Sequence, residues 1–152
     1  MQIRRLIPLD DPADLDDVVA LRASWAHDRA GDGDLDELRR RIRDWLRAEG
    51  DSRVLWGAYA EEGAVGLVCL LEYTRMPDLG RPPGRWGYVA QLYVRPQARR
   101  RGVATALMGA LIDHARERGM VRLVLNPSEI SRELYASLGF RRADELLLLP
   151  LV

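Results

Sequence analysis

One stretch of the chain constrains the fold more than any other. An apolar run ends at Val94, three consecutive arginines follow at 99–101, and a glycine then opens an amphipathic segment. This segment, Gly102–Arg118, is predicted to be a helix, because its apolar residues recur at the spacing of one helical face. A second apolar run, Val121–Leu125, follows the glycine that ends the helix. A strand, a helix and a strand in this order form a parallel pair with a right-handed crossover.

The segments before this unit add an antiparallel part. Val54–Ala60 and Ala64–Tyr73 are predicted to be strands joined by a tight Glu61-Glu62-Gly63 hairpin. Ahead of them we expect a first strand at Ile3–Ile7 and two helices, one from Pro12 to a break at residues 31–34 and one over about Leu35–Ala48.

The segments after the hairpin complete the predicted order. We expect a fourth strand at Tyr88–Val94, a last helix that Ser128 caps and that ends at Leu138, and a final strand at Leu146–Leu149. The order is β-α-α-β-β-β-α-β-α-β, which predicts an α+β fold with a mixed, mostly antiparallel sheet.

Bulk properties narrow the class of protein. The 152 residues predict one domain, 1–152. A formal net charge of zero gives no reason to expect nucleic acid or an anionic membrane as a partner. There is no apolar run of about 20 residues, as a membrane span needs, and no signal-peptide pattern. The single cysteine, Cys69, excludes an intrachain disulfide. We therefore expect a cytoplasmic protein.

The helix that begins at Gly102 has the features of an anion site. The first amides of a helix have no internal partner, and the helix dipole adds positive potential there. Gly102 lets a ligand approach the backbone closely, Ala104 keeps the next turn small, and the side chains of Arg99, Arg100 and Arg101 add charge. These features indicate phosphate or pyrophosphate binding. A solvated arginine run is the alternative interpretation.

The sequence lacks the other common phosphate-, dinucleotide- and calcium-binding motifs. The chain has no G-x-x-x-x-G-K-[ST] sequence, which excludes a P-loop. Gly31-Asp32-Gly33 lacks a preceding strand and a third glycine, so it is not a dinucleotide fingerprint. The spacing of Asp32, Asp34 and Asp36 is that of a calcium loop, but Glu37 and Arg43 stand where that loop needs glycine and glutamate. No metal site is expected, and the local arginine run is too short for a nucleic-acid surface.

Two motifs at this point resemble a known family. Arg99-x-x-Gly102-x-Ala104 resembles the Q/R-x-x-G-x-G/A signature of the GNAT superfamily of N-acetyltransferases. Tyr135, followed by x-x-x-Gly139-Phe140, resembles the second signature of that superfamily. The interval between the motifs and the order of elements fit as well. The resemblance covers nearly the whole chain and implies a GNAT-like fold, with acetyl-CoA as the acyl donor.

The resemblance also implies which residues bind acetyl-CoA. In the family, the fourth and fifth strands splay apart and the pantetheine arm lies between them. The backbone of Leu92 and Val94 would bind that arm. Asn126 and Ser128, just past the fifth strand, would make polar contacts. Tyr135 would protonate the departing thiolate. The pyrophosphate would be held at the helix start by Arg99, Arg100, Arg101, Gly102, Val103, Ala104 and Thr105.

The general base is the main departure from the family pattern. Many relatives carry a glutamate on the fourth strand, four residues before the position of Val94, where this chain has Ala90. Glu72 or Tyr73, acting through water, are the candidates within the chain, and bulk water is the third.

The implied function is transfer of an acetyl group from acetyl-CoA to a primary amine by direct attack in a ternary complex. A weak or inactive acetyl-CoA-sensing module is the alternative. The loop over Arg75–Arg85 and the two N-terminal helices are expected to form the acceptor cleft, with a small molecule favoured over a protein. A run of acidic residues favours a cationic acceptor: Asp10, Asp11, Asp14, Asp16, Asp17 and Asp28. Homodimerisation is left open.

Overall fold

A computed structural model describes residues 1–30 and 33–151, with only the backbone described for residues 28–30. The predicted break at 31–34 therefore lies partly outside the described residues, and so does the side chain of Asp28. None of the described helices is both long and apolar enough to span a bilayer.

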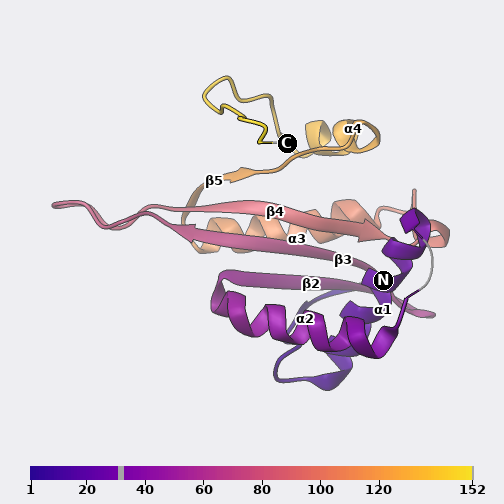
Figure 1. The fold of residues 1–152 in the computed structure, drawn as a ribbon. Helices are drawn as coiled ribbons and strands as arrows, with labels where there is room; N and C mark the ends of the chain where they lie inside the picture. Colours follow the sequence, from indigo (N-terminus) through magenta and orange to yellow (C-terminus); the bar gives the residue numbers. More distant parts are fainter. Residues whose placement is uncertain (31–32, 152) are drawn as a thin grey trace.

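The described strands form one five-stranded sheet in the order β1-β2-β3-β4-β5 (Figure 1). Neighbouring strands from β1 to β4 are antiparallel, whereas β4 and β5 are parallel. This confirms the predicted mixed, mostly antiparallel sheet with a parallel pair at one side. The strands are β1 (Gln2–Leu6), β2 (Arg53–Ala60), β3 (Gly63–Thr74), β4 (Arg85–Val94) and β5 (Met120–Val124).

Helices cover both faces of the sheet. The helices α1 (Pro12–Ala30) and α2 (Leu35–Glu49) pack on one face, and α3 (Val103–Glu117) packs on the other (Figure 1). The short helix α4 (Arg132–Ser137) lies beyond β5. Asp34 caps α2, because its carboxylate accepts from the amides of Asp36 and Glu37 at 2.8 and 3.1 Å.

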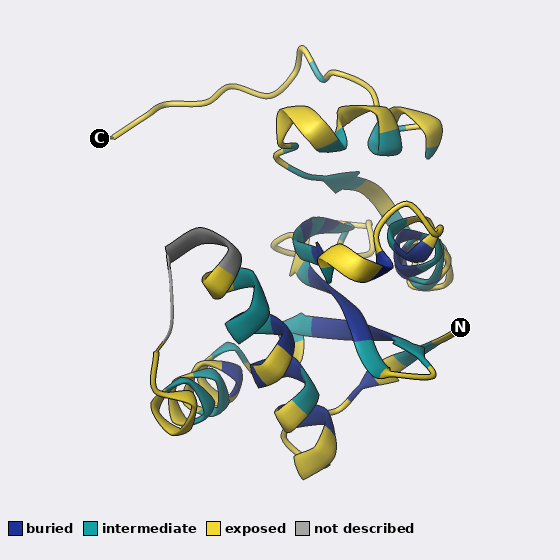
Figure 2. Cartoon of the chain, turned by 90° about the vertical axis from the view of Figure 1, so that its right-hand side faces the viewer, coloured by how far each residue is buried: buried dark blue, intermediate teal, exposed yellow. Residues whose placement is uncertain are grey.

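Alternation along β3 separates two cores. Val68 and Leu70 point to the α3 side, whereas Leu67 and Cys69 point to the side of α1 and α2. Cys69 is buried, and burial raises the pKa of its thiol to about 11. Cys69 is therefore a protonated core residue at neutral pH. Figure 2 shows the burial concentrated between the layers, while α4 and the segment after it are largely exposed.

A buried ion pair ties β1 to α1. The Asp14 side chain is fully buried, lies 2.5 Å from the guanidinium of Arg4 and accepts from the amide of Ile7 at 2.7 Å. Burial alone would raise the pKa of Asp14, but the hydrogen bonds from Arg4 and Ile7 outweigh it and hold the pKa below its usual value.

Two local predictions were wrong. Residues 146–149 form no strand, because the chain turns at Ala143, whose carbonyl accepts from the Leu146 amide at 3.5 Å, and then runs without a neighbouring strand. Ser128 does not cap α4 with its side chain. Its hydroxyl bonds to the Ser131 hydroxyl at 2.9 Å, a 3₁₀ turn (Glu129–Ser131) intervenes, and α4 begins only at Arg132.

Candidate functional site

The parallel strands β4 and β5 touch at one end and then diverge. Their register runs from Arg85↔Met120 to Tyr88↔Val124, whereas β4 continues to Val94. Figure 1 shows β5 rising away from β4 and the chain continuing toward α4. Gly87 sits in the paired end, where an added Cβ would lie 2.6 Å from Leu70 and 2.8 Å from Leu123. The predicted splay is therefore present, and close packing at Gly87 fixes its closed end.

The free edge of β4 presents backbone groups to the side of β5. The amide of Arg95 donates to the carbonyl of Val65 at 2.9 Å, so the backbone of Arg95 points toward β3. By the alternation of a strand, the backbone groups of Val94 and Leu92 point the opposite way, into the divergence. Arg99 Nε donates to the Val94 carbonyl at 2.9 Å. Leu92 and Val94 thus belong to a strand edge that an extended amide chain could join.

A bulge interrupts β4 where the strands have parted. The register changes between Leu67↔Tyr93 and Cys69↔Ala90, and Gln91 has φ 48°. A left-handed conformation is costly for a residue with a side chain, and such bulges re-aim a strand. The bulge was not predicted from the sequence, because a glutamine gives no signal for positive φ.

The turn before α3 forms a nest of amides. Arg100 has φ 61° and Gly102 has φ 78°, and alternation of left-handed residues along a turn aims successive amides at one point. The first intrahelical bond is from the amide of Ala106 to the carbonyl of Gly102 at 3.0 Å, so the amides of 103–105 have no partner within the helix. Within the part of the chain that the structure describes, no side chain caps this helix start. The side chains of Arg99, Arg100 and Arg101 are exposed beside it, so the turn concentrates positive potential.

Tyr135 of α4 joins the core on the α3 side. Its half-buried side chain packs against the core cluster on this side, to which Leu92, Val94 and Leu125 also contribute. Its ring meets Phe140 edge-on, with centroids 5.7 Å apart. Burial raises the pKa of Tyr135, with an opposing effect from its hydrogen bond with Ser131, so the phenol is protonated at neutral pH. Asn126 and Ser128 lie exposed just past β5.

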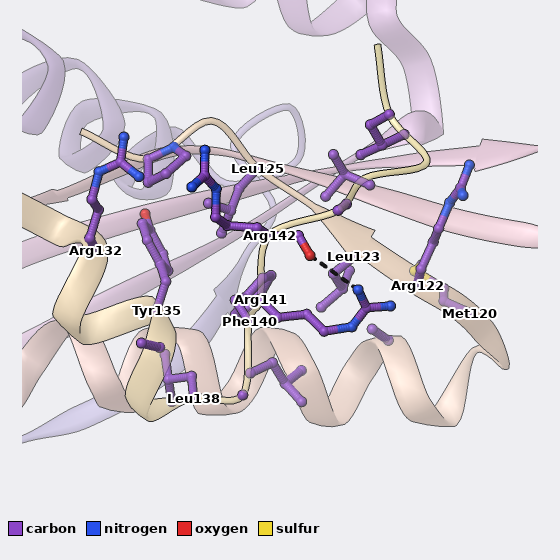
Figure 3. Close-up of a pocket in the computed structure, with 18 of the residues that line it drawn as sticks. Met120, Arg122, Leu123, Leu125, Arg132, Tyr135, Leu138, Phe140, Arg141 and Arg142 are labelled. Atoms are coloured by element: carbon purple, nitrogen blue, oxygen red, sulfur yellow. Dashed lines mark hydrogen bonds between the residues drawn. The ribbon is translucent and has the colours of Figure 1, made fainter. Parts of the chain in front are cut away.

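Figure 3 shows the hollow of about 810 Å³ that Tyr135 helps to line, between α3, β5, α4 and the segment after α4. Its floor is apolar and its rim carries arginines, among them Arg122, Arg132 and Arg142. The hollow lies against the outer side of β5, away from β4.

Glu72 is not brought together with the other predicted site residues. It pairs with Gly87 in the closed end of β4 and faces α3, where its carboxylate meets His114 Nε2 at 2.7 Å and Arg118 at 3.3 Å. Burial would raise the pKa of Glu72, but the hydrogen bond from His114 and the charge of Arg118 hold it below its usual value. Glu72 is therefore a firmly ionised member of an ion-pair network.

The opposite face of β4 is lined with aromatic side chains. Tyr73 and Trp86 pair across β3 and β4 and stack at 4.3 Å, and Arg122 lies over Trp86 at 5.5 Å. Ala90 pairs with Cys69 and so shares this face. The loop between β3 and β4 projects at the end of the sheet opposite the arginine turn (Figure 1).

The acidic residues of α1 are engaged in packing. Asp14 pairs with Arg4, Asp16 pairs with Arg39 of α2, and Asp17 accepts from the Tyr59 hydroxyl at 2.6 Å. These three carboxylates therefore do not add up to an unpaired acidic surface for an acceptor. Among the described residues, no three His, Cys, Asp or Glu side chains gather as metal ligands would.

Comparison with known proteins relates this geometry to one family. The model of the acetyltransferase (GNAT) family matches residues 18–140. A search of functionally curated proteins finds no match.

Solved structures share the fold along the whole chain. A predicted acetyltransferase with acetyl-CoA from Clostridium acetobutylicum is 25% identical, covers 99% of this chain and 96% of its own, and has a TM-score of 0.72. A GCN5-related N-acetyltransferase from Ralstonia eutropha JMP134 is 28% identical, with coverages of 98% and 97% and a TM-score of 0.70. A ribosomal-protein-alanine N-acetyltransferase from Brucella melitensis biovar Abortus 2308 is 27% identical, with 99% of both chains covered and a TM-score of 0.70.

Proposed function

Because the chain belongs to the acetyltransferase (GNAT) family, we propose that it transfers the acetyl group of acetyl-CoA to a primary amine of a small molecule. The observation that carries the proposal is the divergence of β4 from β5 directly beside the amide nest before α3. A strand edge and an anion site in this order match a ligand that has an extended amide arm joined to a pyrophosphate. The Clostridium acetobutylicum neighbour, which holds acetyl-CoA, supports this donor.

The donor would bind along β4. Its pantetheine amides would exchange hydrogen bonds with the backbone of Leu92 and Val94, as an added strand does. Its pyrophosphate would meet the amides of residues 100–105, where the helix dipole and the arginines at 99–101 offset its charge. Asn126 and Ser128 would contact the arm from the β5 side.

The amine would attack the thioester of acetyl-CoA directly, without a covalent enzyme intermediate. The lone pair of the neutral amine forms the C–N bond at the thioester carbonyl, and the C–S bond then breaks. The phenol of Tyr135 gives its proton to the departing thiolate, and the amine loses one proton. A backbone amide at the bulge of β4 would polarise the carbonyl. Holding both substrates in one complex supplies positioning, which is worth several kcal/mol in such reactions, roughly 7–11 at most.

We propose that water accepts the proton that the amine loses. Glu72 faces α3 and is bound by His114 and Arg118, so its ion pairs oppose a role as base. Ala90 carries no side-chain base on the opposite face, so water would take this part. Since acetyl-CoA is a metabolite of the reducing interior and Cys69 is a free thiol, we place the reaction in the cytoplasm.

A second candidate function follows from the alanine at position 90. Without a carboxylate at position 90, the domain could bind acetyl-CoA and signal its presence without transferring the acetyl group. The nest before α3 serves both functions, whereas a proton donor at Tyr135 is useful only for transfer.

One experiment separates these functions. The purified protein is incubated with acetyl-CoA and a panel of small amines and N-terminal peptides, while release of free thiol is followed. Amine-dependent thiol release supports transfer, and calorimetric binding without release supports sensing. If no acyl-CoA binds at millimolar concentration, both are wrong. Faster turnover with peptides than with every small amine would overturn the small-molecule acceptor.

A further inference from the structure

The aromatic face of β3 and β4, formed by Tyr73, Trp86 and Tyr88, is only partly covered by helices. Trp86 pairs with Tyr73, and Tyr88 lies two residues farther along β4, so the three rings share the side of the sheet on which α1 and α2 pack. Among the described residues, the core beneath these helices includes Cys69 and Tyr93 but neither Trp86 nor Tyr88. Tyr73 is 39% exposed, and the other two rings are partly exposed. This face can therefore be reached by a ligand.

Arg122 of β5 extends over the aromatic face. Its neighbour Leu123 pairs with Gly87 and packs against the core on the α3 side, so by alternation Arg122 points to the opposite side. The guanidinium carbon of Arg122 lies 5.5 Å from the centroid of the Trp86 ring, and that ring stacks on Tyr73 at 4.3 Å. The stacked rings thus hold the end of a long, exposed side chain in one place.

This arrangement leaves the hydrogen-bonding edge of the Arg122 guanidinium open. A guanidinium over a ring interacts through its flat face, whereas its N–H donors point outward in its own plane. Two neighbouring arginines, Arg85 and Arg118, lie within ion-pair distance of Glu72 on the other face of the sheet. Within the described part of the chain, Arg122 has no carboxylate at that distance, and its contact with Trp86 engages no N–H donor.

An oriented guanidinium with open donors is suited to a carboxylate. Its planar fork matches the two carboxylate oxygens and can donate to both of them at once. One guanidinium balances the single charge of a carboxylate, whereas a phosphate monoester carries about −1.5 to −2. The apolar rings beside Arg122 keep water from one side of such a pair, and a lower local dielectric strengthens it.

The position of Arg122 relative to the bulge of β4 determines the shape of the ligand. Ala90, next to the bulge at Gln91, shares the aromatic face, and Trp86 lies four residues before it on the same strand. At about 3.3 Å per residue, this separation is roughly 13 Å. A ligand with its amine at the bulge reaches Arg122 only through an extended chain of about this length. Such a chain would lie along Tyr88.

We propose that Arg122, held by Trp86, binds a carboxylate of the acceptor. The acceptor is then an elongated small molecule with a primary amine at one end, a carboxylate at the other and an apolar chain between them. This inference rests on the proposed transfer of an acetyl group to a small amine, and it adds the substrate class.

The first test compares linear ω-amino acids with their carboxamides as acceptors. The series runs from glycine to a chain about as long as β4 between Ala90 and Trp86, and release of thiol from acetyl-CoA is followed. For the long members, kcat/KM should be about tenfold higher for the acid than for the amide, as expected for hydrogen bonds to a charged group. Arg122→Gln should abolish this preference by raising KM for the long acids, with kcat and the amides unchanged.

Arg142→Gln is the matched control. It removes the same charge, and Arg142 lines the same hollow as Arg122, but Figure 3 shows the two side chains standing apart. This variant should keep the preference for acids. Trp86→Phe, which retains a ring beneath the guanidinium, should keep it as well, whereas Trp86→Leu should weaken it. An equal loss in Arg142→Gln and Arg122→Gln would indicate a general effect of charge and overturn the proposed site.

The inference and the proposed transfer can fail separately. Equal turnover of long acids and amides by the wild type, or an acid preference that survives Arg122→Gln, would overturn the inference and leave acetyl transfer intact. The same holds if other amines are acetylated but no member of the series is.

Calorimetry with the longest ω-amino acid, in the presence of CoA, gives a readout that needs no turnover. Binding should be about tenfold weaker for the amide, and also for the acid with Arg122→Gln. If no amine releases thiol, the transfer function is wrong, and acid-selective binding that depends on Arg122 would still support the carboxylate site. Binding without this selectivity would exclude the site.

Discussion

Arg99 Nε donates a hydrogen bond of 2.9 Å to the carbonyl oxygen of Val94. The bond joins the first arginine of the turn to the last residue of β4, so the anion site and the free strand edge are held in one fixed relation. The guanidinium also lies over the ring of Tyr93, 5.9 Å from its centroid. A ligand that spans both parts would therefore meet a turn whose position is set by the strand it follows.

Gly102→Glu should lower acetyl-CoA affinity by at least about tenfold, because it adds a carboxylate to the helix start and strains a residue with φ 78°. Calorimetry measures the effect. Gly109→Glu is the control, since it places the same charge farther along α3 at a position with open space around it, and it should bind normally. Equal binding by both variants would show that the nest does not hold the pyrophosphate.

Tyr135→Phe should reduce turnover by about 10²-fold, the low end for loss of a general acid, because thiolate is already a fair leaving group. Acetyl-CoA affinity should be nearly unchanged, because the ring remains. Affinity, turnover and melting temperature are compared on one sample. A purely structural tyrosine would instead lower the melting temperature and spare turnover with a saturating acceptor. Burial raises the pKa of Tyr135 above that of a free phenol, about 10. Loss of this proton should therefore cause no decrease in the wild-type rate at any pH from 7 up to that value.

Glu72→Gln should lower the melting temperature while turnover per folded molecule stays within about twofold, since the carboxylate serves the ion pairs with His114 and Arg118. Wild type and variant should share one pH–rate profile, which follows the pKa of the acceptor amine. A large loss of turnover at an unchanged melting temperature, recovered at high pH, would instead make Glu72 the base.

Asp14→Asn should destabilise the fold by about 1.5–3 kcal/mol at pH 7, because it removes the charge from the buried acceptor of the hydrogen bonds that Arg4 and the Ile7 amide donate. The pKa of Asp14 is lowered in the folded state, so its contribution is complete above the unfolded value of about 3.9 and is lost as the pH falls through the folded value. Urea unfolding at several pH values should show wild type and variant converging in the acid range. Asp113→Asn, at an exposed position, should change stability little at any pH.

The parts of the site that depend on neighbouring residues were predictable from the sequence. A glycine after a basic turn and before an amphipathic helix determines the nest locally, and the crossover from β4 to β5 follows from the order of elements. Glu72 is an intermediate case. Alternation with Cys69 could have placed it on the α3 face, but its partners His114 and Arg118 lie far along the chain, in α3 and directly after it.

The features that the sequence did not reveal depend on distant or unusual geometry. Leu146–Leu149 has the composition of a strand, but a strand also needs a partner, and pairing is decided by the whole fold. Ser128 has the right residue type for a cap, yet the neighbouring Ser131 hydroxyl competes for it. The bulge at Gln91 places a glutamine in a conformation that its side chain disfavours, and residue type alone gives no sign of it.

The contact at Gly87 has a consequence for the thermodynamics of binding. Because β4 and β5 are packed together at that end, their separation at the other end is made when the chain folds. The cost of leaving the edge of β4 without a neighbouring strand is therefore contained in the free energy of unfolding of the protein. A ligand that joins this edge needs to spend little of its own affinity on ordering the backbone, so preorganisation favours tight association with a small loss of conformational entropy.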